Sequence, residues 1–134
     1  MGCEPVTLLL DTHVVHWWSA EPERLSRKAS EAVREADELA VVDVTWFELA
    51  WMARHGRIVL RVPILSWLLQ LSQQLRTIVV TPEIADIAVA LADSFPGDPA
   101  DRLMYATAVE RGWRLVTKDS RLRRHPHPGP LTLW

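Results

Sequence analysis

The sequence has few residues of several types, and each shortage excludes a class of protein. It contains one cysteine, Cys3, in 134 residues, so no internal disulfide can form and we assign Cys3 no role. The longest apolar stretch without a charge runs from Val62 to Leu71, far short of the roughly 20 residues that cross a bilayer. The first residues lack the basic flank of a secretory signal. We therefore expect a cytoplasmic protein with no membrane segment.

The sequence also lacks an excess of positive charge. Its formal net charge is −2, whereas nucleic-acid-binding proteins commonly carry a basic surface. Composition therefore argues mildly against a nucleic-acid substrate. Cations do gather in the last quarter of the chain, where they form either a solvated face or a substrate contact; they are Arg111, Arg114, Lys118, Arg121, Arg123 and Arg124.

What is present is an alternation of short apolar runs with longer segments of helical period. This alternation is typical of a parallel sheet covered by helices on both faces. A chain of this length that is 49% hydrophobic supports one core, so we expect a single α/β domain over residues 1–134, a three-layer sandwich. The predicted strands, about five in number, are Val6–Leu10, Leu39–Val42, Thr77–Val80, Arg114–Val116 and Leu131–Leu133.

The helices are predicted from apolar periodicity and from residues that start or stop a helix. The predicted helices span residues 25–36, 45–55 and 64–75, and two more begin at Pro82 and Pro99. Residues 25–36 carry apolar side chains on one face and charged ones on the other, as an outer helix does. Gly56 is a typical helix stop, and a proline at a helix start loses nothing because no N–H is needed there. Residues 125–130, HPHPGP, predict a stiff connector to the last strand.

Four acids fall where these strands end or the next helices begin. Asp11 ends the run TLLL, Glu48 and Asp101 lie in the first turns of helices, and Asp119 follows RLVT by two residues. In an open parallel sheet, ligands bind outside the carboxyl ends of the strands. Carboxylates gathered there repel one another unless a divalent cation joins them. Oxygen ligands alone suit Mg²⁺ or Mn²⁺, which predicts metal-assisted phosphodiester hydrolysis.

Each acid also has an ordinary structural explanation. Thr45 and Glu48 have the spacing of a capping box, and Asp98 precedes Pro99 as an N-cap would. Asp101 fits a first-turn acid that favours the helix dipole, and Asp119 fits a turn. Asp11 is the hardest to explain in this way, because a carboxylate ending an apolar strand is costly to bury without a partner.

Long segments of the chain are similar to PIN-domain proteins, and specifically to the VapC toxins of bacterial toxin–antitoxin pairs. The similar segments are LLLDTHVVHWW, VTWFELAWMARHGRI and, most specifically, DPADRLMYATA followed by LVTKD. The resemblance implies helices around a parallel sheet of about five strands. It also implies a homodimer, an antitoxin partner, and Mg²⁺- or Mn²⁺-dependent cleavage of RNA, often transfer or ribosomal RNA.

The resemblance also implies roles for individual residues. The metal-site acids of the family fall on Asp11, Glu48, Asp101 and Asp119, while Thr117 matches the usual hydroxyl residue and Asp98 a supporting acid. Two further residues, Thr12 and Arg102, are expected to support the site or contact substrate, although a plain surface ion pair is the alternative for Arg102. The chain departs from its relatives in lacking a basic or His residue just before DPADR. Lys118, between Thr117 and Asp119, either lowers the affinity of the site for metal or binds a phosphate of the substrate, and we favour phosphate binding.

Two further segments combine candidate functional residues with aromatic or apolar neighbours. His13 and His16, beside Trp17 and Trp18, are candidates for metal ligands or a general base, but we expect them to line the substrate groove or pack under it. The segment carrying Glu48 is apolar almost all round, which indicates burial on more than one side. By resemblance this is a homodimer face and a groove for the antitoxin; ordinary core packing is the alternative.

Other function classes are weaker matches. A phosphorylated receiver domain needs two adjacent acids after the first strand, whereas Thr12 and His13 follow Asp11. A haloacid-dehalogenase-type phosphatase needs Asp-x-Asp at that place. A PIN fold that binds RNA or an antitoxin without cutting is the remaining alternative, and the complete set of acids argues against it.

Overall fold

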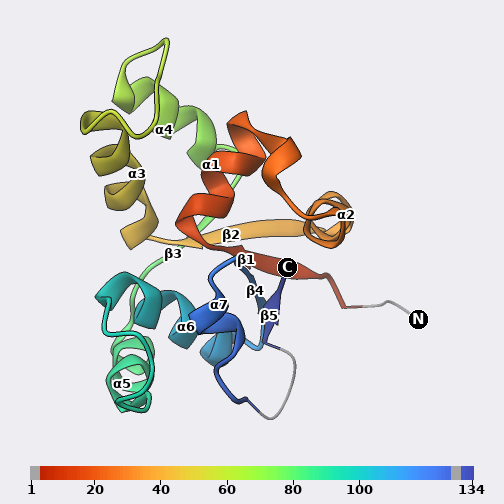
Figure 1. The fold of residues 1–134 in the computed structure, drawn as a ribbon, viewed down its shortest axis with the longest axis vertical. Helices are drawn as coiled ribbons and strands as arrows, with labels where there is room; N and C mark the ends of the chain where they lie inside the picture. The colour runs from red at the N-terminus through yellow and green to blue at the C-terminus, as the bar shows by residue number, and fades with distance from the viewer. Residues whose placement is uncertain (1–3, 128–130) are drawn as a thin grey trace.

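The computed structural model describes residues 4–127 and 131–134 as a five-stranded parallel sheet with helices on both faces (Figure 1). The strand order is β3-β2-β1-β4-β5. The strands are β1 (Thr7–Leu10), β2 (Glu38–Val42), β3 (Arg76–Ile78), β4 (Arg114–Val116) and β5 (Thr132–Leu133). The helices are α1 (Thr12–Ala20), the 3-10 turn η1 (Pro22–Arg24), α2 (Arg27–Glu35), α3 (Val44–Arg54), α4 (Ile64–Ser72), α5 (Pro82–Ala90), α6 (Pro99–Arg111) and α7 (Ser120–Arg123). The predicted α/β sandwich is confirmed.

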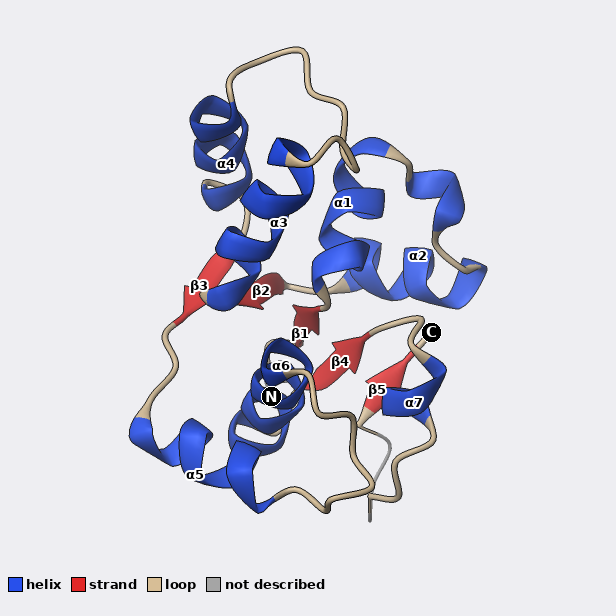
Figure 2. Cartoon of the chain, turned by 60° about the vertical axis from the view of Figure 1, so that its left-hand side comes forward, coloured by secondary structure: helices blue, strands red, loops and turns tan. Residues whose placement is uncertain are grey.

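The alternation of side chains along each strand divides the core into two halves. Leu8 and Leu10 of β1 pack with α1, α2, α3 and α4, whereas Leu9 packs with α5, α6 and α7 on the other face. Figure 2 shows the same two layers of helices from another side. Because parallel strands are buried on both faces, the three buried residues of β1, Leu8–Leu10, form a continuous apolar run instead of an alternating one.

All four ladders are parallel, so the strands end at one edge of the sheet. The chain leaves β1, β2 and β4 at this edge to enter α1, α3 and α7. Asp11, the first residue after β1, is held in the sheet by its backbone N–H, which donates to Val116 O at 3.1 Å. The topology thus delivers the starts of three helices to the same place.

Several boundaries differ from the sequence prediction. Ser26 caps α2 by accepting from Ala29 N at 3.0 Å, so this helix begins two residues later than expected. β3 ends at Ile78, two residues earlier than predicted. Helix 64–75 stops at Ser72, and Gly56 follows α3 with a φ of 77°, a conformation that glycine adopts without strain. A separate helix at 12–20 was not delimited from the sequence.

The predicted capping box at Thr45 is wrong. α3 begins at Val44 with Asp43 as its N-cap, and Asp43 makes no side-chain cap hydrogen bond. The hydroxyl of Thr45 is instead fully buried and lies 3.0 Å from Thr12 Oγ1. Glu48 is therefore free of a capping role.

No helix in residues 4–127 or 131–134 is long and apolar enough to cross a membrane. Cys3 and the last part of the predicted connector, residues 128–130, lie outside the described residues.

Candidate active site

The four predicted acids line one pocket of about 470 Å³ at the carboxyl-end edge of the sheet. Asp11 comes from the end of β1, Glu48 from α3, Asp101 from α6 and Asp119 from the turn after β4. Asp98 also lines this pocket, which we call the acid pocket. Acids separated by up to 108 positions in the sequence therefore converge.

Asp11 is the most deeply buried of these acids, with 7% of its surface exposed. Thr117 Oγ1 donates to Asp11 Oδ2 at 2.7 Å, and His13 N donates to Asp11 Oδ1 at 3.3 Å. Burial raises the pKa of Asp11 despite these hydrogen bonds. Thr117 also accepts from Asp119 N at 3.1 Å, so this hydroxyl connects the first and last acids of the site.

Glu48 is held by a pair of buried threonines. Thr12 Oγ1 donates to Glu48 Oε1 at 2.6 Å and lies 3.0 Å from Thr45 Oγ1. Because the single hydroxyl proton of Thr12 goes to the carboxylate, Thr45 must be the donor to Thr12. Burial raises the pKa of Glu48, and repulsion from Asp98 and Asp11 adds to the effect. Thr45 was missed as a site residue because its spacing to Glu48 resembled a helix cap.

Asp98 and Asp101 lie at the start of α6. Asp98 Oδ1 accepts from Ala100 N at 2.8 Å and from Asp101 N at 3.2 Å, which confirms its predicted role as N-cap. Asp101 has no such cap bond, and its pKa is raised to about 7 by burial and by repulsion from Asp98, Asp11 and Asp119. The pocket therefore concentrates more negative charge than its own walls neutralise.

Arg121 is the cation nearest to these acids. Its Nη2 lies 2.9 Å from Asp119 Oδ2 and 3.7 Å from Asp101 Oδ2, and its Nε donates to Asp119 Oδ1 at 3.3 Å. These hydrogen bonds lower the pKa of Asp119. The sequence analysis placed Arg121 only in a run of cations, because nothing in the sequence shows that α7 turns its side chain back onto the acids.

The chemistry of the pocket fits a divalent cation. All five acidic side chains offer carboxylate oxygens, the donors that Mg²⁺ and Mn²⁺ prefer, and a cation would remove the repulsion that raises the pKa of Asp101. Among residues 4–127 and 131–134, however, no three His, Cys, Asp or Glu side chains already stand close enough together to hold an ion. The oxygens share a pocket, and Arg121 bridges two of the acids within it.

The contacts of Arg102 differ from the expected pairing with a site carboxylate. Its guanidinium donates to five backbone carbonyls, at 3.0 to 3.2 Å, in the last turn of α5 and the segment between α5 and α6. Within residues 4–127 and 131–134, Arg102 forms no ion pair with a carboxylate, so the alternative of a surface ion pair is wrong as well. Arg102 positions the segment that leads to Asp98.

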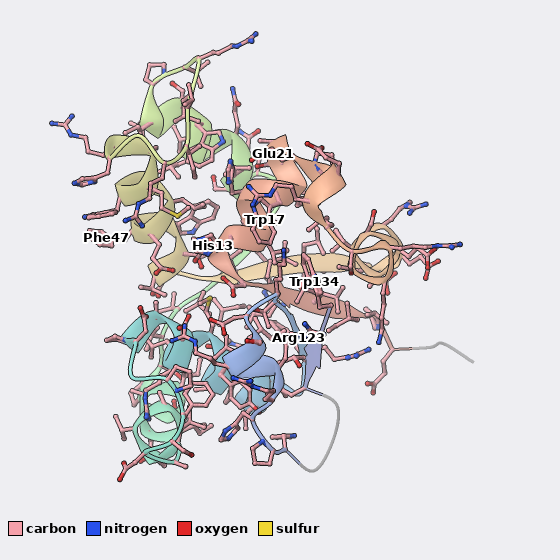
Figure 3. All side chains as sticks on the ribbon, in the orientation of Figure 1. His13, Trp17, Glu21, Phe47, Arg123 and Trp134 are labelled. Carbon is pink, nitrogen blue, oxygen red and sulfur yellow. The ribbon has the colours of Figure 1, made fainter. Side chains whose placement is uncertain are left out.

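His13 and Lys118 line the acid pocket, whereas His16 does not. His13 lines the acid pocket, and its ring centroid lies 6.0 Å from that of Trp17 (Figure 3). His16 points elsewhere, with Nε2 3.5 Å from Glu21 Oε2, and burial lowers its pKa. Lys118 lines the pocket with Nζ 5.8 Å from the Trp17 ring.

Comparison with known families matches residues 8–128 to the PIN domain. The chain belongs to the PIN-domain family. This PIN domain is 64% identical over 128 residues to Ribonuclease VapC22 of Mycobacterium tuberculosis, covering 96% of this chain and 98% of that protein. The resemblance to VapC proteins found in the sequence is thereby confirmed.

Solved structures with low sequence identity share the fold. A chain of a toxin–antitoxin complex from Klebsiella pneumoniae matches with a TM-score of 0.70 and 20% identity, over 95% of this PIN domain and 96% of that chain. A chain of VapBC2 from Rickettsia felis, bound to a DNA fragment from its promoter, matches with a TM-score of 0.67 and 14% identity, over 90% and 94%. At these identities the likeness supports the three-layer architecture.

Proposed function

We propose that this PIN domain is a Mg²⁺- or Mn²⁺-dependent endoribonuclease, acting in the cytoplasm as the toxin of a toxin–antitoxin pair. The observation that carries the proposal is the convergence of Asp11, Glu48, Asp101 and Asp119 on one pocket. The extensive identity to a protein named a ribonuclease supports RNA as the substrate, and structured RNA such as transfer or ribosomal RNA is the class we propose.

The roles of the chain's own residues follow from their contacts. Asp11, Glu48, Asp101 and Asp119 would hold the ion, which when bound supplies an activated water and neutralises charge on the scissile phosphate. Thr117 and Thr12 fix the carboxylates of Asp11 and Glu48 by donating hydrogen bonds to them.

Cations at the rim of the acid pocket suit the substrate rather than the ion. Arg121 and Lys118 line the pocket and place positive charge where an RNA phosphate would enter. His13 is exposed at the same rim and is available to contact the nucleotide. His16, which pairs with Glu21, has no part in this proposal.

An antitoxin and a second copy of the chain are the proposed protein partners. A shallow pocket of about 350 Å³, lined by Phe47 and Trp51 of α3, adjoins Glu48 and Asp98. Phe47 is 69% exposed and points away from the core (Figure 3). An antitoxin segment lying here would bring a basic side chain to the acids, while exposed Leu65 and Leu69 of α4 suit a homodimer face.

The test is RNA cleavage with and without metal. Purified protein should cut total transfer and ribosomal RNA in Mg²⁺ or Mn²⁺, and chelation by EDTA should stop it. Asp11→Asn should abolish cleavage while the circular dichroism spectrum stays unchanged. RNA binding without cleavage in every metal would instead support a silent binding module, the alternative function.

A further inference from the structure

A second pocket, to which three cations contribute, lies beside the acid pocket. It measures about 410 Å³ and is lined by Lys28, Ser120, Arg123, Arg124, Thr132 and Trp134; we call it the basic pocket. Trp134 directly follows β5, and β5 runs parallel to β4. Both pockets therefore open at the carboxyl-end edge of the same sheet.

The short helix α7 forms a wall shared by the two pockets. Asp119 and Arg121 line the acid pocket, whereas Ser120, Arg123 and Arg124 line the basic pocket. Ser120, Arg123 and Arg124 share one face of the helix, because they are three and four residues apart, whereas Arg121 lies on another face. A strand of substrate that crosses this helix would touch both pockets.

The cations of the basic pocket have no partners inside the described chain. Lys28, Arg123 and Arg124 are exposed, and across residues 4–127 and 131–134 their side chains form no ion pair or hydrogen bond. Arg121, by contrast, is bound to Asp119. Three uncompensated positive charges around one hollow attract an anion.

Two tryptophans connect the pockets. Trp17 lines the acid pocket, Trp134 lines the basic pocket, and their ring centroids lie 5.8 Å apart. Figure 3 shows Trp17, Trp134 and Arg123 following one another from α1 to α7. The guanidinium of Arg24 lies 4.8 Å from the Trp17 ring centre. Aromatic rings alternating with cations characterise grooves that bind single-stranded nucleic acid.

We propose that the basic pocket binds a backbone phosphate of the same RNA strand whose scissile phosphate lies in the acid pocket. The half-buried Trp134 ring lies on the path between the two phosphates, where a base would stack, and the buried Trp17 ring packs against it. Phosphate contacts fix the register of a nucleic acid on a protein, so this pocket would position the strand for cleavage. The inference rests on the proposed function, because it assumes that RNA is the substrate.

The experiment compares two triple variants, both made in the Asp101→Asn background so that no RNA is cut. The test variant carries Lys28→Gln, Arg123→Gln and Arg124→Gln. The control carries Arg34→Gln, Arg54→Gln and Arg61→Gln, which remove three exposed cations that line neither pocket. Binding of a fluorescent single-stranded RNA of about 12 nucleotides, within the usual site size, is measured across a salt series.

We expect the test variant to bind this RNA about tenfold more weakly at low salt. Its slope of log affinity against log salt should be smaller by about 0.7, because the contact with one phosphate of a single strand is lost. The control variant should match its parent. In the cleaving background the test variant should raise KM for this RNA. It should leave cleavage of an unphosphorylated dinucleotide unchanged, because the only phosphate of a dinucleotide is the scissile one.

Other outcomes would overturn the proposal or its foundation separately. Equal RNA affinity in test variant and parent, or an equal loss in the control, rejects the basic pocket as an RNA subsite. Binding of poly-glutamate is measured in the same way. If the test variant loses it while its RNA affinity is unchanged, the basic pocket binds an acidic protein partner and not RNA. If the unmodified chain cleaves no RNA in Mg²⁺ or Mn²⁺, the proposed function fails, whereas the binding measurement still reports on the pocket.

Discussion

Replacing Asp101 by Asn should stabilise the metal-free protein, although it removes a site residue. Burial and three neighbouring acids raise the pKa of Asp101 to about 7 from an ordinary value of 3.8. Each tenfold change in a dissociation constant corresponds to ~1.4 kcal/mol, so the full cost of ionising this group would be about 4 kcal/mol. Water reaches the open pocket and screens the carboxylates, so we expect about 2 kcal/mol at pH 8.

The sign of the pH dependence follows from the direction of the shift. A carboxyl with a raised pKa in the folded state destabilises that state when ionised, so the advantage of Asp101→Asn is full above pH 7. It should shrink as the pH falls toward 4, where the unfolded chain is protonated too.

Thermal unfolding in EDTA, followed by circular dichroism, measures this effect. At pH 8 the variant should melt about 6 to 10 °C above the parent chain. Asp86→Asn, which changes an exposed acid of α5, is the control and should stay within about 0.5 kcal/mol of the parent. Added Mg²⁺ should raise the melting temperature of the parent more than that of Asp101→Asn, because only the parent keeps all four proposed ligands.

A variant that melts at or below the parent at pH 8 in EDTA would refute the reasoning. It would mean that the acids of the pocket do not repel one another in the metal-free protein, so that a cation would have no repulsion to relieve.

Three further predictions test neighbouring contacts. Thr12→Val removes the hydroxyl that donates to Glu48, so metal-dependent cleavage should fall about tenfold, with an unchanged circular dichroism spectrum as the check that the fold survives. Arg102→Gln removes donors to several backbone carbonyls, so chemical denaturation should show a loss of about 3 kcal/mol, and a change below about 0.5 kcal/mol would contradict the positioning role. Burial lowers the pKa of His16, so below pH 6.5 the unfolded chain takes up a proton that the folded chain resists. Between pH 7 and 5 the parent should therefore lose more free energy of unfolding than His16→Gln. Equal losses in the two proteins would count against this reading.

The sequence was sufficient to predict the α/β architecture and the four acids that line the acid pocket. Strand β4 was predicted with its observed bounds, and the other strands to within two residues at each end, because buried parallel strands are short apolar runs that local composition reveals. The four acids were found because each sits where a strand ends or a helix begins, and that placement is visible in the sequence.

Tertiary structure decided how those acids are held. Thr45 looked like a helix cap, but its hydroxyl is buried against Thr12, and α3 begins one residue earlier than predicted. Arg102 looked like a partner for a carboxylate, yet it lies where five carbonyls converge. Such choices depend on which groups lie nearby in space, because hydrogen bonds act over about 3 Å.

The sequence by itself therefore determined which residues are apolar, which are charged, and at which ends of the elements they lie. Only the folded chain decided that Arg121 turns toward Asp119 while Arg123 and Arg124 face a separate basic pocket. All three cations belong to one run in the sequence. Their division arises because residues three and four apart share a face of a helix, so Arg123 and Arg124 lie on the side of Ser120 and Arg121 does not.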